Sequence, residues 1–322
     1  MTSPAPDPPP TLPVRPSDGH KGTFGTVAVV GGCALPGSRM LGAPALAARA
    51  AARVGAGLVR LACPAPVLDA ALALADHATG RAIPVDAEGG LVPHESAAII
   101  DDLAANATVL VVGPGLGRGA GSAAAVLRAV QQREAIAVID ADALNELAAT
   151  PQLALDFHAP AVLTPHPGEY ARLAAALGLP QVPRTDGERR EAAAELARRL
   201  GCIVVLKGAR TVVSDGYRHW ADDTADAALA AGGTGDVLAG AIAGLAAQFA
   251  RPPVHERARA RLGDRAPRDA ALSLYDVARG GVRAHALAAA GWRAAHDADA
   301  GLLPAELADA LPAAIASMRA PG

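Results

Sequence analysis

The sequence predicts an α/β fold in which a mostly parallel β-sheet is covered by helices on both faces. Short runs of β-branched residues alternate with Ala-rich stretches that are long enough for helices, and this alternation starts at Thr26. The short runs are apolar throughout instead of alternating with polar residues, which is typical of parallel strands buried on both faces. We predict strands at 26–32, 58–63, 108–113, 135–140, 161–164 and 202–208.

Local signals predict a helix and a hairpin near the sixth strand. Thr185 and Glu188 have the spacing of a capping box, ahead of an Ala-, Leu- and Arg-rich run that ends at Leu200. We therefore expect a helix there, leading directly into the strand at 202–208. The segment 211–222 contains two strand-like runs on either side of an Asp-Gly turn, so we expect antiparallel strands at that edge of the sheet.

Composition favours a reducing compartment and disfavours several classes of partner. The chain has 322 residues, of which 51% are apolar but only 2% aromatic, so Ala, Val and Leu must build the core. A formal net charge of -3 at pH 7 gives no general attraction to nucleic acid or to an anionic membrane. The three cysteines are widely spaced and form neither a disulfide framework nor a CxxC metal site, which favours a cytoplasmic location.

Two segments fall outside the alternation. Residues 1–18 are Pro-rich and lack the features of a signal peptide, so we expect an extended, mobile tail. Residues 251–270 combine six arginines with three prolines, and we expect a solvated surface insertion, with an anion- or partner-binding loop as the alternative. Although a prior of roughly 150 residues per domain allows two domains, we expect residues 19–322 to form a single domain that carries the insertion.

The strongest local motif is a glycine turn that opens an apolar helix. It consists of Gly232, Gly233, Thr234, Gly235 and Asp236. Such a turn directs backbone N–H groups into one small volume, where the helix dipole also favours negative charge, so it suits a phosphate. Asp236 has two interpretations: a carboxylate that stabilises the helix N-terminus, or a catalytic base beside the anion site.

Polar residues also follow two of the predicted strands, at the edge where open α/β sheets bind ligands. Asp140, Asp142 and Asn145 follow the fourth strand, where they either cap local structure or position a metal or phosphate. His166 stands between two prolines after the fifth strand, which disfavours a helical conformation and favours a functional role over core packing. Glu169 is expected in the first turn of the following helix, where its charge is favourable.

Glycine-rich loops follow three further strands, at 31–42, 113–117 and 207–211. Each lets the backbone approach a ligand closely, and such loops at consecutive strand ends predict one shared crevice. The first loop lacks the spacing of a dinucleotide-binding fingerprint, and the sequence contains no Walker A loop. Any nucleotide site must therefore use another architecture.

Together these motifs resemble those of ADP/ATP-dependent NAD(P)H-hydrate dehydratases, a branch of the ribokinase-like superfamily. The matching stretches occur in the family's order and read HKGTFGTVAVVGG, GAPALAARAAARVGAGLV, GPGLG, DADALNELA, LTPHPGEYARL, VVLKGARTVV and GGTGDVLAGAIAGL. The resemblance covers roughly 18–250 and resumes around 272–290. It implies a ribokinase-like three-layer α/β/α sandwich with a mostly parallel central sheet. It extends to the dehydratase alone, without the epimerase domain that is fused to many bacterial relatives.

The resemblance implies a repair reaction on damaged cofactor. Hydrated NADH or NADPH is phosphorylated on its ring hydroxyl at the expense of ADP or ATP, after which phosphate leaves and the reduced nicotinamide is restored. Phosphoryl transfer of this kind needs a base and neutralised phosphate oxygens, which Mg²⁺ helps to provide. By matching positions, the implied residues are Asp236 as base; Gly233, Thr234 and Gly235 as anion hole; Lys207, Gly208, Ala209, Arg210 and Thr211 for the nucleotide; Ala43, Gly117 and His166 for the hydrated dinucleotide; and Glu169 for control of magnesium beyond its direct ligands.

Several points depart from the family pattern or stay open. Relatives often place an Asn-Pro and a Thr shortly before the glycine turn, where this chain has Asp226, Ala227 and Ala231. Rival functions are a small-molecule hydroxymethyl kinase of the same fold and a non-catalytic nucleotide-sensing module. The Ala-, Arg- and Gly-rich composition is typical of GC-rich bacteria, whose family members tend to use ADP. We therefore expect ADP and the S epimer of the hydrate as substrates, and a homotetramer as in many family members.

Overall fold

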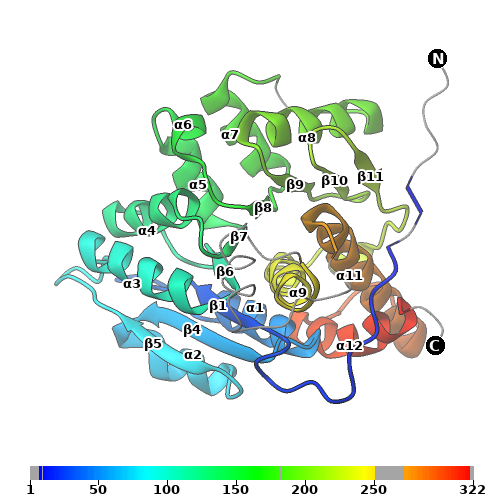
Figure 1. Cartoon of the computed structure of the whole chain (residues 1–322), viewed down its shortest axis with the longest axis horizontal. Coiled ribbons are helices and arrows are strands. Elements are labelled where there is room, and N and C mark those ends of the chain that lie inside the picture. The colour runs from blue at the N-terminus through cyan, green and yellow to red at the C-terminus, as the bar shows by residue number, and fades with distance from the viewer. Residues whose placement is uncertain (1–6, 9, 181–182, 251–271, 320–322) are drawn as a thin grey trace.

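The computed structural model describes residues 7–8, 10–180, 183–250 and 272–319. Within these residues the central sheet has nine strands in the order β11-β10-β9-β8-β7-β6-β1-β4-β5, and every neighbouring pair from β9 to β5 is parallel (Figure 1). The strands are β1 (Thr26–Val30), β4 (Leu58–Pro64), β5 (Thr79–Ile83), β6 (Val109–Val112), β7 (Ile136–Ile139), β8 (Ala161–Leu163), β9 (Ile203–Leu206), β10 (Val212–Ser214) and β11 (His219–Ala221).

Side chains alternate between the two faces of the sheet, and each face carries its own apolar core. In β1, Val27 and Val29 join one core, while Ala28 and Val30 join the other. The first core is covered by α1 (Gly42–Arg53), α2 (Leu68–Leu74), α9 (Thr234–Phe249), α11 (Leu274–His296) and α12 (Pro304–Ser317). The second is covered by α3 (Pro93–Asn106), α4 (Ala120–Gln131), α5 (Asp142–Ala149), α6 (Leu153–Asp156), α7 (Pro167–Leu177) and α8 (Asp186–Leu200). Figure 1 shows the resulting three layers.

The elements predicted from the sequence are confirmed. The six predicted strands are present as β1, β4, β6, β7, β8 and β9. The expected hairpin consists of β10 and β11, which pair antiparallel with Val213 opposite Trp220. The capping box is formed as well: the Thr185 hydroxyl accepts from Glu188 N at 3.2 Å, and the Glu188 carboxylate accepts from Thr185 N at 3.1 Å. The α/β fold class with its mostly parallel sheet is therefore confirmed.

Three strands were not predicted, because each is either largely exposed or only three residues long. The edge strand β5 reads TGRAI, and four of its five residues are exposed. A separate hairpin consists of β2 (Cys33–Leu35) and β3 (Ser38–Met40), and all three β3 residues are exposed. Strands exposed on one side or at an edge lack the continuous hydrophobic pattern of buried parallel strands.

The Pro-rich segment differs from the expected mobile tail in its described residues. Leu12 is only 1% exposed, and its backbone N–H donates to the carbonyl of Met318 at 2.9 Å. Arg15 donates to the Gly55 carbonyl at 3.1 Å, and its guanidinium lies over the Phe24 ring. The segment is extended but held against the protein, because Leu12 is buried in the core that α9 and α11 share.

The predicted insertion at 251–270 lies outside the described residues. In the part of the chain that the structure does describe, no helix is long and apolar enough to cross a bilayer. Cys33, Cys63 and Cys202 are buried, and each is a free thiol.

Candidate active site

Four charged side chains meet where the central strands end. Lys207 follows β9, Asp140 follows β7, and Glu169 and Asp236 lie in the first turns of α7 and α9. The Lys207 ammonium lies 2.6 Å from Asp140 Oδ1 and 3.8 Å from Glu169 Oε2. The charge of Asp236 also raises the pKa of Lys207, together with those of Asp140 and Glu169. One buried cation is therefore shared among three carboxylates.

Burial, assisted by the neighbouring negative charges, raises the pKa of two of the carboxyls. Burial, together with the charge of Asp140, raises the pKa of Asp236 to about 7, against the opposing effect of Lys207. Burial is also the main cause that raises the pKa of Glu169 to about 7. A carboxyl with a pKa near the working pH is suited to accept and release a proton. Asp236 thus has the electrostatic character of a general base, in addition to its position in the first turn of a helix.

Asp140 is held in place from two sides. Its Oδ1 accepts from the Thr164 hydroxyl at 2.7 Å as well as from Lys207, and the residue is only 1% exposed. The next residue, Ala141, has a φ of +50°, which is strained for an alanine and is the kind of conformation that concentrates at functional sites. Asp140 therefore does more than end a strand, because it fixes the Lys207 ammonium beside Glu169.

Two acidic side chains of α5 hold the loop that follows β6. Asp142 Oδ2 accepts from Gly117 N at 2.9 Å, and Glu146 Oε1 accepts from Gly119 N at 3.2 Å. Ala43 of α1 borders the same loop, since a Cβ placed on Gly115 would lie 3.4 Å from the Ala43 Cβ. The role observed for Asp142, holding the backbone of a glycine loop, matches neither of the two interpretations left open for it, a helix cap or a group that positions a metal or phosphate.

His166 is the N-cap of α7. Its Nδ1 accepts from Gly168 N at 3.0 Å, and Glu169 Oε2 accepts from His166 N at 2.8 Å, which completes a reciprocal capping box. Burial and the nearby Lys207 charge lower the pKa of His166. Because Nδ1 accepts hydrogen bonds, the proton of the neutral ring is on Nε2, which lies 3.3 Å from Glu169 Oε1. The histidine therefore caps a helix while its half-exposed ring borders the charged cluster.

The glycine turn opens α9 as predicted. Gly233 is the N-cap with a φ of +97°, which glycine adopts readily. The Thr234 hydroxyl donates to the carbonyls of Leu229 and Ala231, both at 2.9 Å, so it is turned back into the preceding loop. A Cβ on Gly235 would lie 3.4 Å from Lys207 Nζ. The N-terminus of α9 and the Lys207 ammonium therefore face the same volume, and both favour an anion there.

The segment from Lys207 to Thr211 is held by α8. Arg189 donates to the carbonyls of Leu206 at 3.1 Å and Lys207 at 3.2 Å, while Thr211 donates to the Gly208 carbonyl at 3.2 Å. Elsewhere in the segment, the Arg210 guanidinium pairs with Asp186 at 2.8 Å. This segment follows β9, whereas Gly117 follows β6, three strand spacings or about 14 Å away. The site thus has two arms with Asp236 between them.

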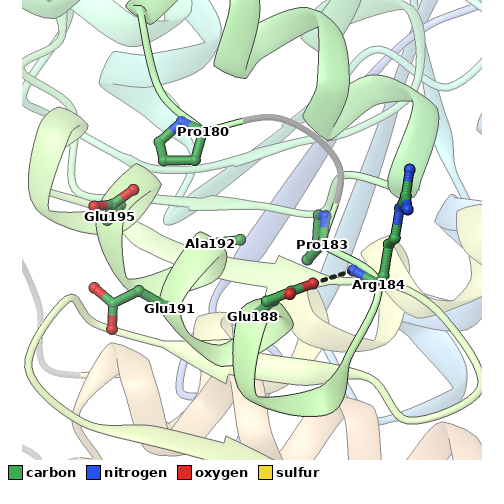
Figure 2. Close-up of a pocket in the computed structure, with 7 residues that line it drawn as sticks. All are labelled: Pro180, Pro183, Arg184, Glu188, Glu191, Ala192 and Glu195. Carbon is green, nitrogen blue, oxygen red and sulfur yellow. Dashed lines mark hydrogen bonds between the residues drawn. The ribbon is translucent and has the colours of Figure 1, made fainter.

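Two of the cavities in the described residues are relevant to the position of the site. One, of about 370 Å³, borders the Gly117 arm and is lined by residues that include Cys33, Leu116 and Arg118. The other, of about 770 Å³, lies between Pro180 and α8, and Figure 2 shows Glu188, Glu191 and Glu195 on its wall. None of its lining residues belongs to the charged cluster, and its glutamates would repel an anionic substrate. We therefore assign the site to the sheet edge and not to the larger cavity.

The structure brings together His166, Glu169, Lys207, Gly235 and Asp236, and it places Ala43 and Gly117 on one arm and residues 208–211 on the other. No supporting role was predicted for Thr164, Glu146 or Arg189. Thr164 opens the polar segment at the end of the fifth predicted strand and Glu146 lies in one of the family-like stretches, whereas nothing in the sequence marks Arg189.

Comparisons with known proteins point to one family. A family model described as NAD(P)H-hydrate dehydratase matches residues 27–313. The chain is 40% identical over 245 residues to the bifunctional NAD(P)H-hydrate repair enzyme Nnr of Moorella thermoacetica, which is 76% of this chain and 44% of that protein. It is 35% identical over 302 residues to the enzyme of the same name from Coxiella burnetii, covering 92% of this chain and 52% of that protein. The chain spans about half the length of these relatives.

Solved structures show the same fold. An ADP/ATP-dependent NAD(P)H-hydrate dehydratase from Bacillus subtilis, co-crystallised with ATP and Mg²⁺, superposes with a TM-score of 0.71 at 26% identity, covering 96% of this chain and 95% of that one. A ribokinase-like superfamily protein from Enterococcus faecalis gives a TM-score of 0.72 at 25% identity, covering 97% and 93%. The fold is therefore ribokinase-like, and the chain belongs to the NAD(P)H-hydrate dehydratase family.

Proposed function

We propose that the chain catalyses ADP-dependent dehydration of the S epimer of NAD(P)H hydrate, and so restores NADH or NADPH. The observation that carries this proposal is the position of Asp236: a partly buried carboxyl whose pKa is raised to about 7, in the first turn of a helix that faces the Lys207 ammonium. A base beside an anion site is what phosphorylation of a hydroxyl requires. Membership of the NAD(P)H-hydrate dehydratase family supports the hydrated nicotinamide ring as the source of that hydroxyl.

The reaction proceeds in two steps. Asp236 takes the proton from the ring hydroxyl. The hydroxyl oxygen at the same time bonds to the terminal phosphorus of ADP, and the bond from that phosphorus to AMP breaks. The C–O bond between the ring and the new phosphate group then breaks, and phosphate leaves with the bonding electrons. The adjacent ring carbon gives up a proton, so that a double bond forms in the ring. The sum is hydrate plus ADP giving NAD(P)H, AMP and phosphate. No redox change is needed, because a hydrate differs from the reduced cofactor only by water.

The two arms of the site suit two substrates. We place the terminal phosphate of the nucleotide between Lys207 and the backbone N–H groups of Gly233 to Gly235, where positive charge and helix dipole act together. The rest of the nucleotide extends along residues 208–211. The hydrated dinucleotide lies toward Ala43 and Gly117, with the half-exposed His166 ring beside it. The separation of about 14 Å between the arms leaves room for both reactants on either side of Asp236.

The donor set suits Mg²⁺ that is carried by the nucleotide. Mg²⁺ prefers oxygen ligands and usually keeps several waters while it binds substrate phosphates. Among the described residues, no group of three or more His, Cys, Asp or Glu side chains is arranged to hold a metal ion. We therefore expect Glu169 to act on a water ligand of Mg²⁺ and not on the metal itself. When bound, Mg²⁺ would neutralise charge on the phosphate oxygens.

The test is a repair assay with each nucleotide in turn. The purified chain is incubated with hydrated NADPH and either ADP or ATP, and recovery of the reduced nicotinamide is followed by its absorbance, with AMP and phosphate measured in parallel. Recovery with ADP supports the proposal. A stable phosphorylated product would indicate a hydroxymethyl kinase, and nucleotide-induced stabilisation without turnover would indicate a sensing module.

Location and assembly are part of the proposal. Three buried free thiols fit a cytoplasmic enzyme, and we expect a homotetramer. Sedimentation at working concentration tests the assembly, and a monomer with full activity would exclude a shared active site.

A further inference from the structure

The glycine turn is contacted from behind by a buried histidine that the mechanism has not used. His285 lies in α11 and is 8% exposed, and its Nε2 is 2.9 Å from the backbone carbonyl oxygen of Thr234. The same two helices also pack closely about two turns further along α9, since a Cβ placed on Gly281 would lie 2.4 Å from Ile242 Cγ1. The histidine therefore joins the body of α11 to the first residue of α9.

The chemistry of this contact fixes the ring's tautomer. A carbonyl oxygen can only accept, so Nε2 must carry a proton, and in the neutral ring Nδ1 is then bare. Burial lowers the pKa of His285 to about 4, and the Lys207 charge acts in the same direction. The ring is therefore neutral at physiological pH and adds no positive charge behind the turn.

The geometry of the peptide group gives the contact a further consequence. The Thr234 carbonyl and the Gly235 N–H belong to one planar trans peptide, so they point in opposite directions. We propose that His285 is a positioning residue: by holding the Thr234 carbonyl on the α11 side, it directs the Gly235 N–H toward the phosphate site beside Lys207. This inference rests on the proposed function, in which that N–H is part of the anion hole.

The flanking glycines make such a tether useful. Gly233 and Gly235 have no side chain to restrict the turn, and Gly233 already has a φ of +97°. Preorganised donors stabilise developing charge only if their direction is fixed before the reaction. A neutral donor from a neighbouring helix supplies that constraint without competing for the phosphate.

The test compares two amide variants that differ in reach. In His285→Gln the side-chain amide nitrogen can reach the position of Nε2, whereas in His285→Asn it ends near Nδ1 and cannot contact Thr234. His296 is the matched control, because it lies in the same helix and its Nδ1 is 2.8 Å from the Trp292 carbonyl, away from the turn. For each variant kcat, KM for hydrate, Kd for ADP and the melting temperature are measured.

We expect His285→Asn to lower kcat by about 10- to 100-fold, as for misplacement of a single catalytic donor, with KM for hydrate unchanged and ADP bound more weakly. His285→Gln should restore kcat and ADP affinity to near the parent values, and His296→Asn should leave both unchanged. Equal kcat in all three variants, or a loss in His285→Gln as large as in His285→Asn, would overturn the inference.

Failure of the proposed function gives a different result. If the parent chain itself restores no reduced nicotinamide, the dehydratase proposal fails, and ADP affinity alone decides the role of His285. If His285→Asn does not fold, His285→Gln still decides: retained ADP affinity and kcat support the tether, and their loss in a folded protein contradicts it.

Discussion

Replacement of Asp236 by Asn separates the catalytic from the structural interpretation of this residue, because the two predict stability changes of opposite sign. In the unfolded chain the carboxyl ionises above its ordinary pKa of 3.8, but in the folded protein it ionises only above about 7. The contribution of this carboxyl to the free energy of unfolding therefore falls as pH rises from about 4 to about 7, and it does not recover at higher pH. The ionised carboxyl destabilises the fold by up to about 4 kcal/mol.

Asp236→Asn removes this destabilisation while it keeps the shape of the side chain. At pH 8 the variant should melt several degrees above the parent, and the difference should narrow toward pH 5, where the parent carboxyl is protonated in the fold. If Asp236 only stabilised the helix N-terminus, the variant would instead lose about 0.3–1 kcal/mol. Thermal unfolding at the two pH values decides between these outcomes.

The kinetic effect should be large. Loss of a general base typically lowers the rate by about 10²- to 10⁴-fold, so kcat should collapse while ADP still binds. In the parent, kcat/KM should fall as pH drops through about 7, since the base must be ionised to accept a proton. Asp69→Asn, in the exposed first turn of α2, is the matched control and should keep full activity. An Asp236→Asn variant that is less stable than the parent but retains most of its kcat would refute this assignment.

Further predictions concern three other residues. His166→Ala should raise KM for hydrate far more than KM for ADP, and it should lower stability by about 1 kcal/mol through loss of the helix cap. His166→Asn should keep the helix cap and its stability but still raise KM for hydrate. Unchanged KM values in both variants would remove His166 from the substrate site. Lys207→Met should lower stability by about 3–5 kcal/mol in urea at pH 8, because it leaves the buried Asp140 unpaired. Stability should partly recover at pH 5, where Glu169 and Asp236 are protonated; a pH-independent loss would contradict this. Leu12→Ala should lower stability by about 2–5 kcal/mol, as for a fully buried leucine, and a change below about 0.5 kcal/mol would show that the N-terminal segment is detached in solution.

The elements of the fold could be predicted where burial leaves a pattern in the sequence. Six of the seven parallel strands, all except the edge strand β5, were predicted because their sequences are almost entirely apolar, with Arg60 of β4 as an exception. The start of α8 is marked by its capping box. The edge strand β5 and the anchoring of Leu12 left no such pattern. An exposed edge tolerates polar residues, and a single leucine among prolines looks the same whether or not a core accepts it.

The loops that carry the site could also be found from the sequence, since glycine turns and polar residues directly follow strands. Which of these loop residues lie next to one another could not be predicted from the sequence. Lys207 and Asp140 are 67 residues apart, and only the order of β7, β8 and β9 in the sheet makes them neighbours.

The sequence by itself determined which residue types stand at the sheet edge: a glycine turn before Asp236, a lysine after one strand and an aspartate after another. Only the tertiary structure decided what their chemistry would be. The pKa of Asp236 near 7 arises because folding removes water from the carboxyl and places it near Asp140, with one lysine shared among three carboxylates. Desolvation and charge interactions depend on distances across the sheet, and those distances are set by strand order and not by separation along the chain.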